Sequence, residues 1–341
     1  MNDHIGAMPQ PGVRLPGILP GATAGRPGLL ELARAHAAMR IAIVHPCDQT
    51  SLVAMRDAQL AGLIEPLIVA PRARVEAVAA ASAIALDGIR IEHVEHSHAA
   101  AARAVELAAN GTVSALMKGS LHTDELMSAV MAPGSGLRTD KRISHCFLMH
   151  TPAYERAFII TDAAINIAPD LDEKAAIAQN AIDLAHVLGV ARPRVAILCA
   201  VETVNARMRA TVDAAALSKM AERGQLTGAA VDGPLAFDNA ISESAALMKG
   251  IVSPVAGHAD ILLVPDIEAG NMLAKQLEFL GGAASAGIVL GARVPVVLTS
   301  RADSVASRLA SCALAVLLAA HASPRSISLL DSGHASVVSH A

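Results

Sequence analysis

Short apolar runs alternate with alanine-rich segments along most of the chain, and this alternation limits the folds open to it. The runs have the length and β-branched content of buried strands, while the segments between them have the composition of helices. Strands that alternate with helices of this length form a parallel sheet with helices on both faces. The sequence therefore predicts an α/β fold. The clearest runs are RIAIVH, LIEPLIVA, IRIEHVEH and VSALMKG, and two of the segments are ARVEAVAAASA and HAAAARAVELAAN.

Size and composition restrict the function. A chain of 341 residues exceeds the roughly 250–300 at which single cores stop growing, which favours two domains. The first 28 residues are rich in Gly and Pro and lack periodicity, so we expect a flexible arm. A change in amino-acid composition near residue 150 marks the expected domain boundary. A net charge of -4, one tyrosine and four phenylalanines argue against nucleic-acid binding. We expect a soluble enzyme acting on small molecules.

The expected compartment is the cytoplasm. No apolar run reaches the ~18 residues that a membrane span needs, and the N-terminus lacks a charged region followed by an apolar one. The four cysteines, Cys47, Cys146, Cys199 and Cys312, are far apart and mostly in apolar surroundings. We predict reduced core thiols, with neither a disulfide framework nor a metal site.

The segment from Val294 to Leu298 reads as a strand, and Ser300 and Arg301 follow where it ends. Ligands of parallel α/β folds bind outside the carboxyl ends of strands, and an arginine fork suits phosphate or carboxylate. Asp303 or Ser304 can cap the helix that follows. These residues are therefore candidates for chemistry, although Arg301 would equally suit a simple ion pair with Asp303 in an exposed loop.

A second polar cluster follows the VSALMKG strand. Lys118 and Ser120 lie at the strand end, and Thr123 is expected to cap a helix with two acids in its first turn. Those acids would repel a phosphate on the helix axis, so an anion must lie beside the terminus. His122 is either a base or a loop histidine with satisfied hydrogen bonds.

Further polar residues lie in loops and at strand ends of the remaining chain. The Gly-rich loop from 133 to 142 carries Arg138 and Arg142, which form either an anion clamp or a solvated basic loop. RISHCFLMH and RAFIITDAA flank Thr151-Pro152 and read as antiparallel neighbours. Polar strand exits converging on one cleft between two domains would explain the pattern. Asp162, Asn166, Asp266 and Asn271 follow strand ends, whereas Asp232 and Asp238 lie in an irregular segment that is either a functional loop or a capping loop.

Six segments, taken together, identify a family. They are LMKGSLHTDELM, GLRTDKRISHCFLM, IITDAAINIAPDLDEK, ERGQLTGAAVDGPLAFDNAIS, ADILLVPDIEAGNMLAKQL and VPVVLTSRADS, spread in order through residues 40 to 315. They resemble the phosphate acetyltransferase and phosphate butyryltransferase family, particularly its butyryl-type branch and the acyltransferase half of enoyl-CoA hydratase/phosphate acetyltransferase proteins.

The resemblance implies two α/β/α domains arranged as in isocitrate and isopropylmalate dehydrogenases, with the active site in the cleft between them. Domain 1 would comprise residues 29–150 plus 301–330, domain 2 residues 151–300, and the protein would form a homodimer or larger homo-oligomer. The implied reaction is acyl-CoA plus phosphate giving acyl phosphate plus CoA, by direct attack in a ternary complex. CoA is a substrate and no cofactor is needed. The chain length of the acyl group, acetyl or butyryl, stays open.

The resemblance also implies roles for individual residues. The acetyl branch uses a Ser-Arg pair that corresponds to Ser300 and Arg301, but its aspartate base has no counterpart near Ser307. A CoA thiol has a pKa of about 8.5, so a modest base suffices. We expect Asp303 to be this base, with His122 as second choice. The predicted substrate-binding residues are Lys118, Ser120, Thr123, Arg138, Arg142, Asp162, Asn166, Asp266 and Asn271.

Two other functions stay open. The first is a metal- and NAD-dependent decarboxylating dehydrogenase of the same fold, using Asp162, Asp232, Asp238 and Asp266. It would need a nicotinamide site, and no GxGxxG segment follows a strand. The second is a non-catalytic acyl-CoA-binding subunit that lost activity together with its base.

Overall fold

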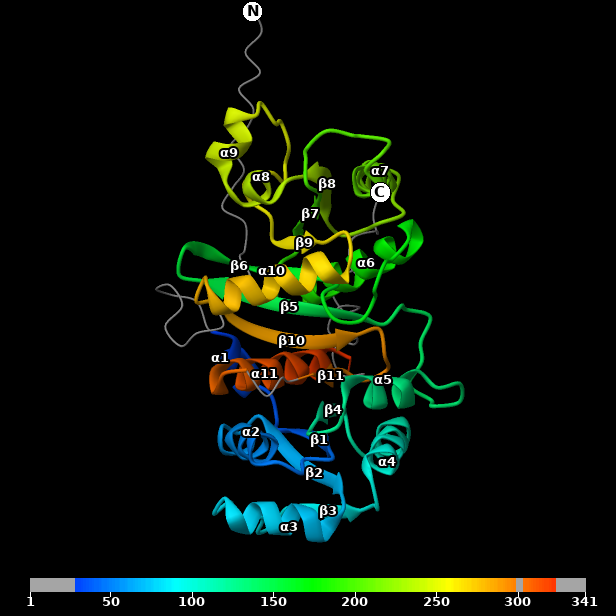
Figure 1. Cartoon of the computed structure of the whole chain (residues 1–341), viewed down its shortest axis with the longest axis vertical. Helices are drawn as coiled ribbons and strands as arrows, with labels where there is room; N and C mark the ends of the chain where they lie inside the picture. The colour runs from blue at the N-terminus through cyan, green and yellow to red at the C-terminus, as the bar shows by residue number, and fades with distance from the viewer. Residues whose placement is uncertain (1–27, 299–302, 323–341) are drawn as a thin grey trace, which may run out of the picture.

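The computed structural model describes residues 28–298 and 303–322. The predicted N-terminal arm therefore lies almost wholly outside the described residues, as do Ser300 and Arg301. The described strands form one sheet of eleven, in the order β3-β2-β1-β4-β11-β10-β5-β6-β9-β7-β8. Figure 1 shows this sheet running along the length of the molecule, from β3 at the bottom to β8 at the top. The predicted mixed α/β fold with a mainly parallel sheet is confirmed.

The first half of the chain consists of alternating strands and helices, as predicted. Strand β1 pairs in parallel with β2 and β4, and β2 pairs in parallel with β3. The elements are α1 Leu29–Arg34, β1 Met39–Val44, α2 Gln49–Leu60, β2 Ile64–Ala70, α3 Arg72–Ala81, β3 Arg90–His93, α4 Ser97–Ala109, β4 Ala115–Lys118 and α5 Thr123–Met131.

Antiparallel strands occupy the middle of the sheet. Strand β5 (Ser144–Thr151) pairs antiparallel with β6 (Tyr154–Thr161), which confirms the predicted pair around Thr151-Pro152. Strand β10 (Ala284–Leu290) pairs antiparallel with β5 and with the short β11 (Val296–Val297). Strand β11 in turn pairs in parallel with β4. Segments that are distant in sequence therefore join the two halves of the molecule.

The second half resumes the parallel pattern. Strand β9 pairs in parallel with β6 and β7, and β7 pairs in parallel with β8. The strands of both halves belong to one sheet, so the predicted division into two domains stays a prediction. The elements are α6 Leu171–Val187, β7 Arg194–Leu198, α7 Arg209–Glu222, β8 Ala230–Leu235, α8 Phe237–Ile241, α9 Glu243–Met248, β9 Ile261–Leu263 and α10 Ile267–Phe279.

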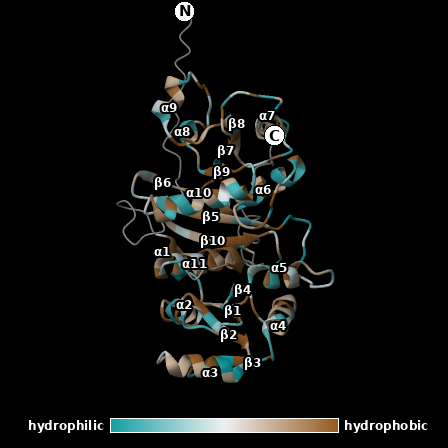
Figure 2. Ribbon diagram, in the orientation of Figure 1, coloured by the Kyte–Doolittle hydropathy of each residue, from teal (hydrophilic) through white to brown (hydrophobic). Residues whose placement is uncertain are grey.

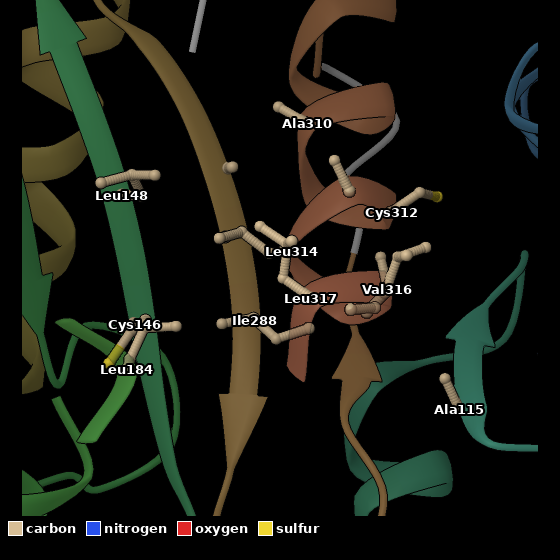
Figure 3. Close-up of a cluster of buried hydrophobic side chains, with 14 of the residues drawn as sticks. Ala115, Cys146, Leu148, Leu184, Ile288, Ala310, Cys312, Leu314, Val316 and Leu317 are labelled. Carbon is tan, nitrogen blue, oxygen red and sulfur yellow. The ribbon is translucent and has the colours of Figure 1, made fainter. Parts of the chain in front are cut away.

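Helix α11 (Val305–His321) lies at the centre of the molecule, where it packs against β10 and against the helices α1 and α2. Leu314 and Leu317 point toward β10 and Ile288, while Cys312 and Val316 face the other way (Figure 3). Strand β10 is coloured as hydrophobic over most of its length (Figure 2). A core of small aliphatic side chains lets the helix lie close to the sheet, as the alanine-rich sequence predicts.

The helix starts near the predicted site differ in part from the sequence prediction. Thr123 was expected to cap α5, but it is the first helical residue and His122 occupies the N-cap position without a side-chain cap bond. The physical reason is that His122, not Thr123, has the extended backbone of a cap. Of the two candidates for α11, Ser304 is the cap, and its side chain accepts a hydrogen bond from the Ser307 amide at 3.0 Å.

The cysteines behave as predicted. All four are buried and free. Burial raises the pKa of the Cys146 thiol to about 12 and that of Cys199 to about 11. Thiols held protonated in this way are poor nucleophiles, so they serve as core residues.

Candidate active site

A cavity of about 970 Å³ lies between the loop after β4 and helix α10. Its lining residues come from both halves of the sheet, but of the six polar residues expected to converge there only Asn271 lines it. The sequence-predicted residues that it brings together are Lys118, Ser120, His122, Thr123, Asn271 and Asp303. The other lining residues are Leu121, His145, Phe147, Ala164, Ile267, Glu268, Met272, Lys275 and Leu298.

One wall is the loop from β4 to α5, which is fixed by contacts with the end of β1. The Gly119 amide donates to the Val44 carbonyl at 2.8 Å, and the Ser120 amide donates to the His45 carbonyl at 2.9 Å. A Cβ on Gly119 would lie 2.5 Å from the Val44 oxygen, so only glycine permits this approach. The Ser120 hydroxyl donates to the His45 carbonyl and accepts from the Cys47 amide. The loop therefore presents Lys118 from a rigid base.

The opposite wall is α10. Asp266 caps this helix by accepting from the Ala269 amide at 2.8 Å, and its carboxylate does not line the cavity. Asn271 donates to the Ala163 carbonyl at 3.1 Å. Lys275 pairs with Glu278 at 2.7 Å and places its ammonium 6.0 Å from the centre of the Phe147 ring. The helix thus supplies a polar amide and a cation to the cavity.

Asp162 and its neighbours form a separate network. The buried Asp162 carboxylate accepts from the Ala164 amide at 2.9 Å and from the Asn166 side chain at 2.6 Å. Asn166 in turn accepts from Arg142 Nε at 2.7 Å, and Arg142 also pairs with Glu173 at 2.7 Å. Asp162, Asn166, Arg142 and Glu173 do not line the cavity. The network holds the turn after β6 against the start of α6.

Arg138, the other predicted anion-binding arginine, is exposed and does not line the cavity. Its backbone forms an isolated antiparallel bridge with Ala292. Five residues with predicted substrate-binding roles do not line the cavity: Arg138, Arg142, Asp162, Asn166 and Asp266. Their roles stay predictions.

The four carboxylates that a metal-dependent dehydrogenase would need do not converge. Asp162 and Asp266 accept local backbone hydrogen bonds, Asp232 accepts from the Gly233 amide, and Asp238 pairs with Lys249 at 3.3 Å. Within residues 28–298 and 303–322, no three His, Cys, Asp or Glu side chains are placed to hold a metal ion. This donor arrangement does not favour the dehydrogenase alternative.

His145 and Phe147 on β5 were missed as site residues. Their rings pack edge to face with centroids 4.3 Å apart. Burial lowers the pKa of His145 to about 4, and Lys275 acts in the same direction while Asp162 opposes it. The signal was present in the RISHCFLMH segment, because an imidazole within an apolar strand is unusual and two-residue spacing puts it on the same face as Phe147.

Comparison with known proteins decides the family. A family model described as "Phosphate acetyl/butaryl transferase" matches residues 95–316, which include both walls of the cavity and the segment after β11. The chain belongs to this family.

Individual relatives of the acetyl/butyryl transferase family match most of the chain. Phosphate acetyltransferase of Rhizobium meliloti is 60% identical over 292 residues, covering 86% of this chain and 92% of that protein. Phosphate butyryltransferase of Clostridium acetobutylicum is 40% identical, with 82% and 93% covered. A branched-chain phosphotransacylase structure from Enterococcus faecalis V583 superposes with a TM-score of 0.73 at 30% identity, covering 82% and 99%.

One property concerns membranes. Among the described helices, none combines the length and the apolar character that crossing a bilayer requires.

Proposed function

We propose that this chain transfers a short acyl group reversibly between coenzyme A and inorganic phosphate, by direct attack in a ternary complex. The observation that carries this proposal is the convergence of family-matched segments on one cavity: the β4–α5 loop, α10 and Asp303 all line it. Its relatives are named as phosphate acetyltransferases and phosphate butyryltransferases.

The chemistry of the cavity suits an acyl phosphate. Lys118 and Lys275 supply positive charge on opposite walls, and Phe147 and Leu298 supply apolar surface beside them. An acyl phosphate needs both kinds of contact, because its anion is charged and its acyl chain is not. The cavity volume of about 970 Å³ lies at the upper end of the ~300–1,000 Å³ typical of small-molecule sites.

Ser300 and Arg301 are proposed to act on the reacting group. Support comes from their neighbours, because Leu298 and Asp303, on either side of the pair, both line the cavity. Ser300 would donate to the developing oxyanion, and Arg301 would neutralise the phosphate. Asp303 is the proposed base for the thiol of CoA, with His122 as second choice.

The wider organisation is part of the same proposal. Residues 29–150 with 301–330 would form one domain and residues 151–300 the other, in the arrangement of the isocitrate and isopropylmalate dehydrogenases. Lys118 and Asn271 then reach the cavity from different domains, which supports an active site in the cleft between them. We further propose a cytoplasmic homodimer or larger homo-oligomer that requires no cofactor, with acyl-CoA, CoA, phosphate and acyl phosphate as substrates and products.

One assay tests the function. Purified protein is supplied with acetyl-, butyryl- and longer acyl-CoA, and thiol release is followed with and without phosphate, with no metal or NAD added. Phosphate-dependent release is expected. Reduction of NAD that requires a metal ion would identify the dehydrogenase alternative instead, and binding of acyl-CoA without turnover would identify a non-catalytic subunit. The chain-length series also ranks the acyl groups, since one methylene is worth ~1–3 kcal/mol.

A further inference from the structure

The imidazole of His145 is a buried polar group without a role in the proposed reaction. The residue is 1% exposed, lies on β5 and lines the cavity. Its Nδ1 atom is buried and has no hydrogen-bond partner among the described residues. Other described side chains contain such an atom, but His145 is the one among them that also lines this cavity. A polar atom left unsatisfied at a cavity wall calls for a hydrogen-bond partner, which a bound ligand or an ordered water can supply.

The surrounding strands are built to hold this ring. Gly287 on β10 pairs with Phe147 in the strand register, and a Cβ there would come within 3.0 Å of His145 Nε2 and 3.3 Å of the Phe147 ring. Phe147 packs edge to face against the imidazole. A ring confined between a glycine and an aromatic neighbour has few rotamers, so it is preorganised for contact with a ligand.

We propose that His145 is a catalytic residue that donates a hydrogen bond to the carbonyl oxygen of the bound acyl group. This inference rests on the proposed function, and it adds a donor at the centre of the sheet to the residues after β11.

The protonation state fits a donor. With its pKa at about 4, His145 is neutral at pH 7 and has one N–H group and one lone pair. As a base it would be poorly matched to a CoA thiol of pKa about 8.5. A neutral N–H donor, in contrast, strengthens its hydrogen bond as the carbonyl oxygen gains negative charge.

Charged groups face the ring from several elements. Asp162 raises the pKa of His145 and Lys275 lowers it, while burial dominates both. The other titratable side chains that line the cavity are Lys118, His122, Glu268 and Asp303.

The hydrogen bond acts during carbonyl addition. The CoA thiolate forms a C–S bond to the carbonyl carbon of the acyl phosphate, and the C=O π electrons move onto the oxygen that His145 contacts. When the C=O bond re-forms, the C–O bond to phosphate breaks and phosphate leaves with that electron pair. His145 keeps its proton throughout, and the thiol proton goes to the base.

The test compares variants that differ in donor capacity. His145→Asn and His145→Gln place an amide N–H near one or the other ring nitrogen, whereas His145→Phe keeps a ring and removes both. We expect kcat to fall ~10²-fold or more in the phenylalanine variant, the loss of one oxyanion donor. At least one amide variant should stay within ~10-fold of wild type, with KM for CoA and phosphate little changed.

A matched control lies on the same strand. His150 also has a buried Nδ1 without a partner among the described residues, but it does not line the cavity. His150→Phe should leave kcat unchanged.

A spectroscopic measurement separates this inference from the proposed function. Isotope-edited infrared spectra of bound acetyl-CoA labelled with ¹³C at the carbonyl should show a band at lower frequency than in solution. In His145→Phe the band should return toward its solution position, whether or not the protein turns over. An unshifted band in wild type, an equal shift in both proteins, or near-normal kcat in the phenylalanine variant would overturn the assignment. A wild type that binds acetyl-CoA with a His145-dependent shift but releases no thiol with phosphate would overturn only the proposed function.

Discussion

Asp303 and Ser304 are adjacent residues at the start of α11, and only the Ser304 side chain caps the helix. The sequence left open whether Asp303 caps α11, a structural role that would compete with proton transfer. Ser304 is the cap, and Asp303 instead lines the cavity beside the β4–α5 loop. Because Ser304 supplies the N-cap hydrogen bond of α11, capping does not compete with the proposed role of Asp303 as the base.

Asp303→Asn should lower kcat in the CoA-consuming direction by ~10²-fold or more, the low end of what general-base catalysis contributes. The cap is unchanged, so the melting temperature should stay the same. The measurement is kcat as a function of pH: the wild-type rate should rise with pH through ionisation of the base, and the variant should lose that rise.

His122→Gln is the matching control for Asp303→Asn. If it abolishes activity while the Asp303 variant keeps most of it, the base is His122. If both variants stay active, the positive charge of the site populates the thiolate without a dedicated base.

Arg301 is expected to hold phosphate in the ground and transition states. Arg301→Ala and Arg301→Lys should each raise KM for phosphate and lower kcat by ~10²-fold or more, because lysine cannot form the two parallel hydrogen bonds of a guanidinium. Steady-state kinetics with varied phosphate measures both constants. Near-normal turnover of the lysine variant would remove Arg301 from the mechanism.

At the scale of elements, a buried ion pair joins α6 to α7. Lys174 Nζ lies 2.7 Å from Asp213 Oδ2, and the two side chains are 6% and 9% exposed. Charges removed from water are costly unless they stay paired, so this contact fixes how the two helices pack. It lies away from the cavity lining, and its effect is on stability.

Lys174→Met should lower the free energy of unfolding by up to ~3–5 kcal/mol, because the buried Asp213 carboxylate then keeps only the largely exposed Arg209, 3.6 Å away, as a cationic partner. Adding Asp213→Leu should recover most of that loss. Urea unfolding measures both values. The exposed pair of Lys141 and Asp183 provides the comparison: Lys141→Met should change stability by less than ~1 kcal/mol. Equal losses in the two lysine variants would contradict the burial argument.

At the scale of the whole molecule, stability should depend on pH through His145. Its pKa of about 4 in the folded protein lies below the ordinary 6.5, so below pH 6.5 the unfolded chain binds a proton that the folded chain excludes. Stability must therefore fall as pH drops from 6.5 toward 4, by about 2 kcal/mol at pH 5.

Urea unfolding at pH 7 and pH 5 checks this dependence. The loss between the two pH values should be smaller by about 2 kcal/mol in His145→Phe than in wild type. The exposed His36 serves as control, since His36→Gln should leave the wild-type loss unchanged. Equal losses in all three proteins would show that His145 titrates in the folded state as it does in the unfolded chain.

How much the sequence predicted depends on how local each feature is. The alternation of strands and helices is a local signal, and it correctly predicted the parallel units and the β5–β6 pair. The pairing of β10 with β5 joins Ala284 to His150, and no local pattern specifies a contact across that sequence distance. Strand-end residues such as Lys118, the last residue of β4, were predicted because a polar side chain contrasts with the apolar strand before it. His145 was missed because a histidine inside an apolar strand looks like part of the core.

The order of strands has a consequence for synthesis. Strands β10 and β11 are the last two strands of the described residues, yet they lie in the middle of the sheet, between β4 and β5. A ribosome-bound chain that ends before residue 284 can form the two outer groups of strands but lacks the ones that connect them. Each group meanwhile exposes an unpaired strand edge, which is open to pairing with other chains. The sheet closes, and this exposure ends, only when the segment from 284 to 297 has emerged.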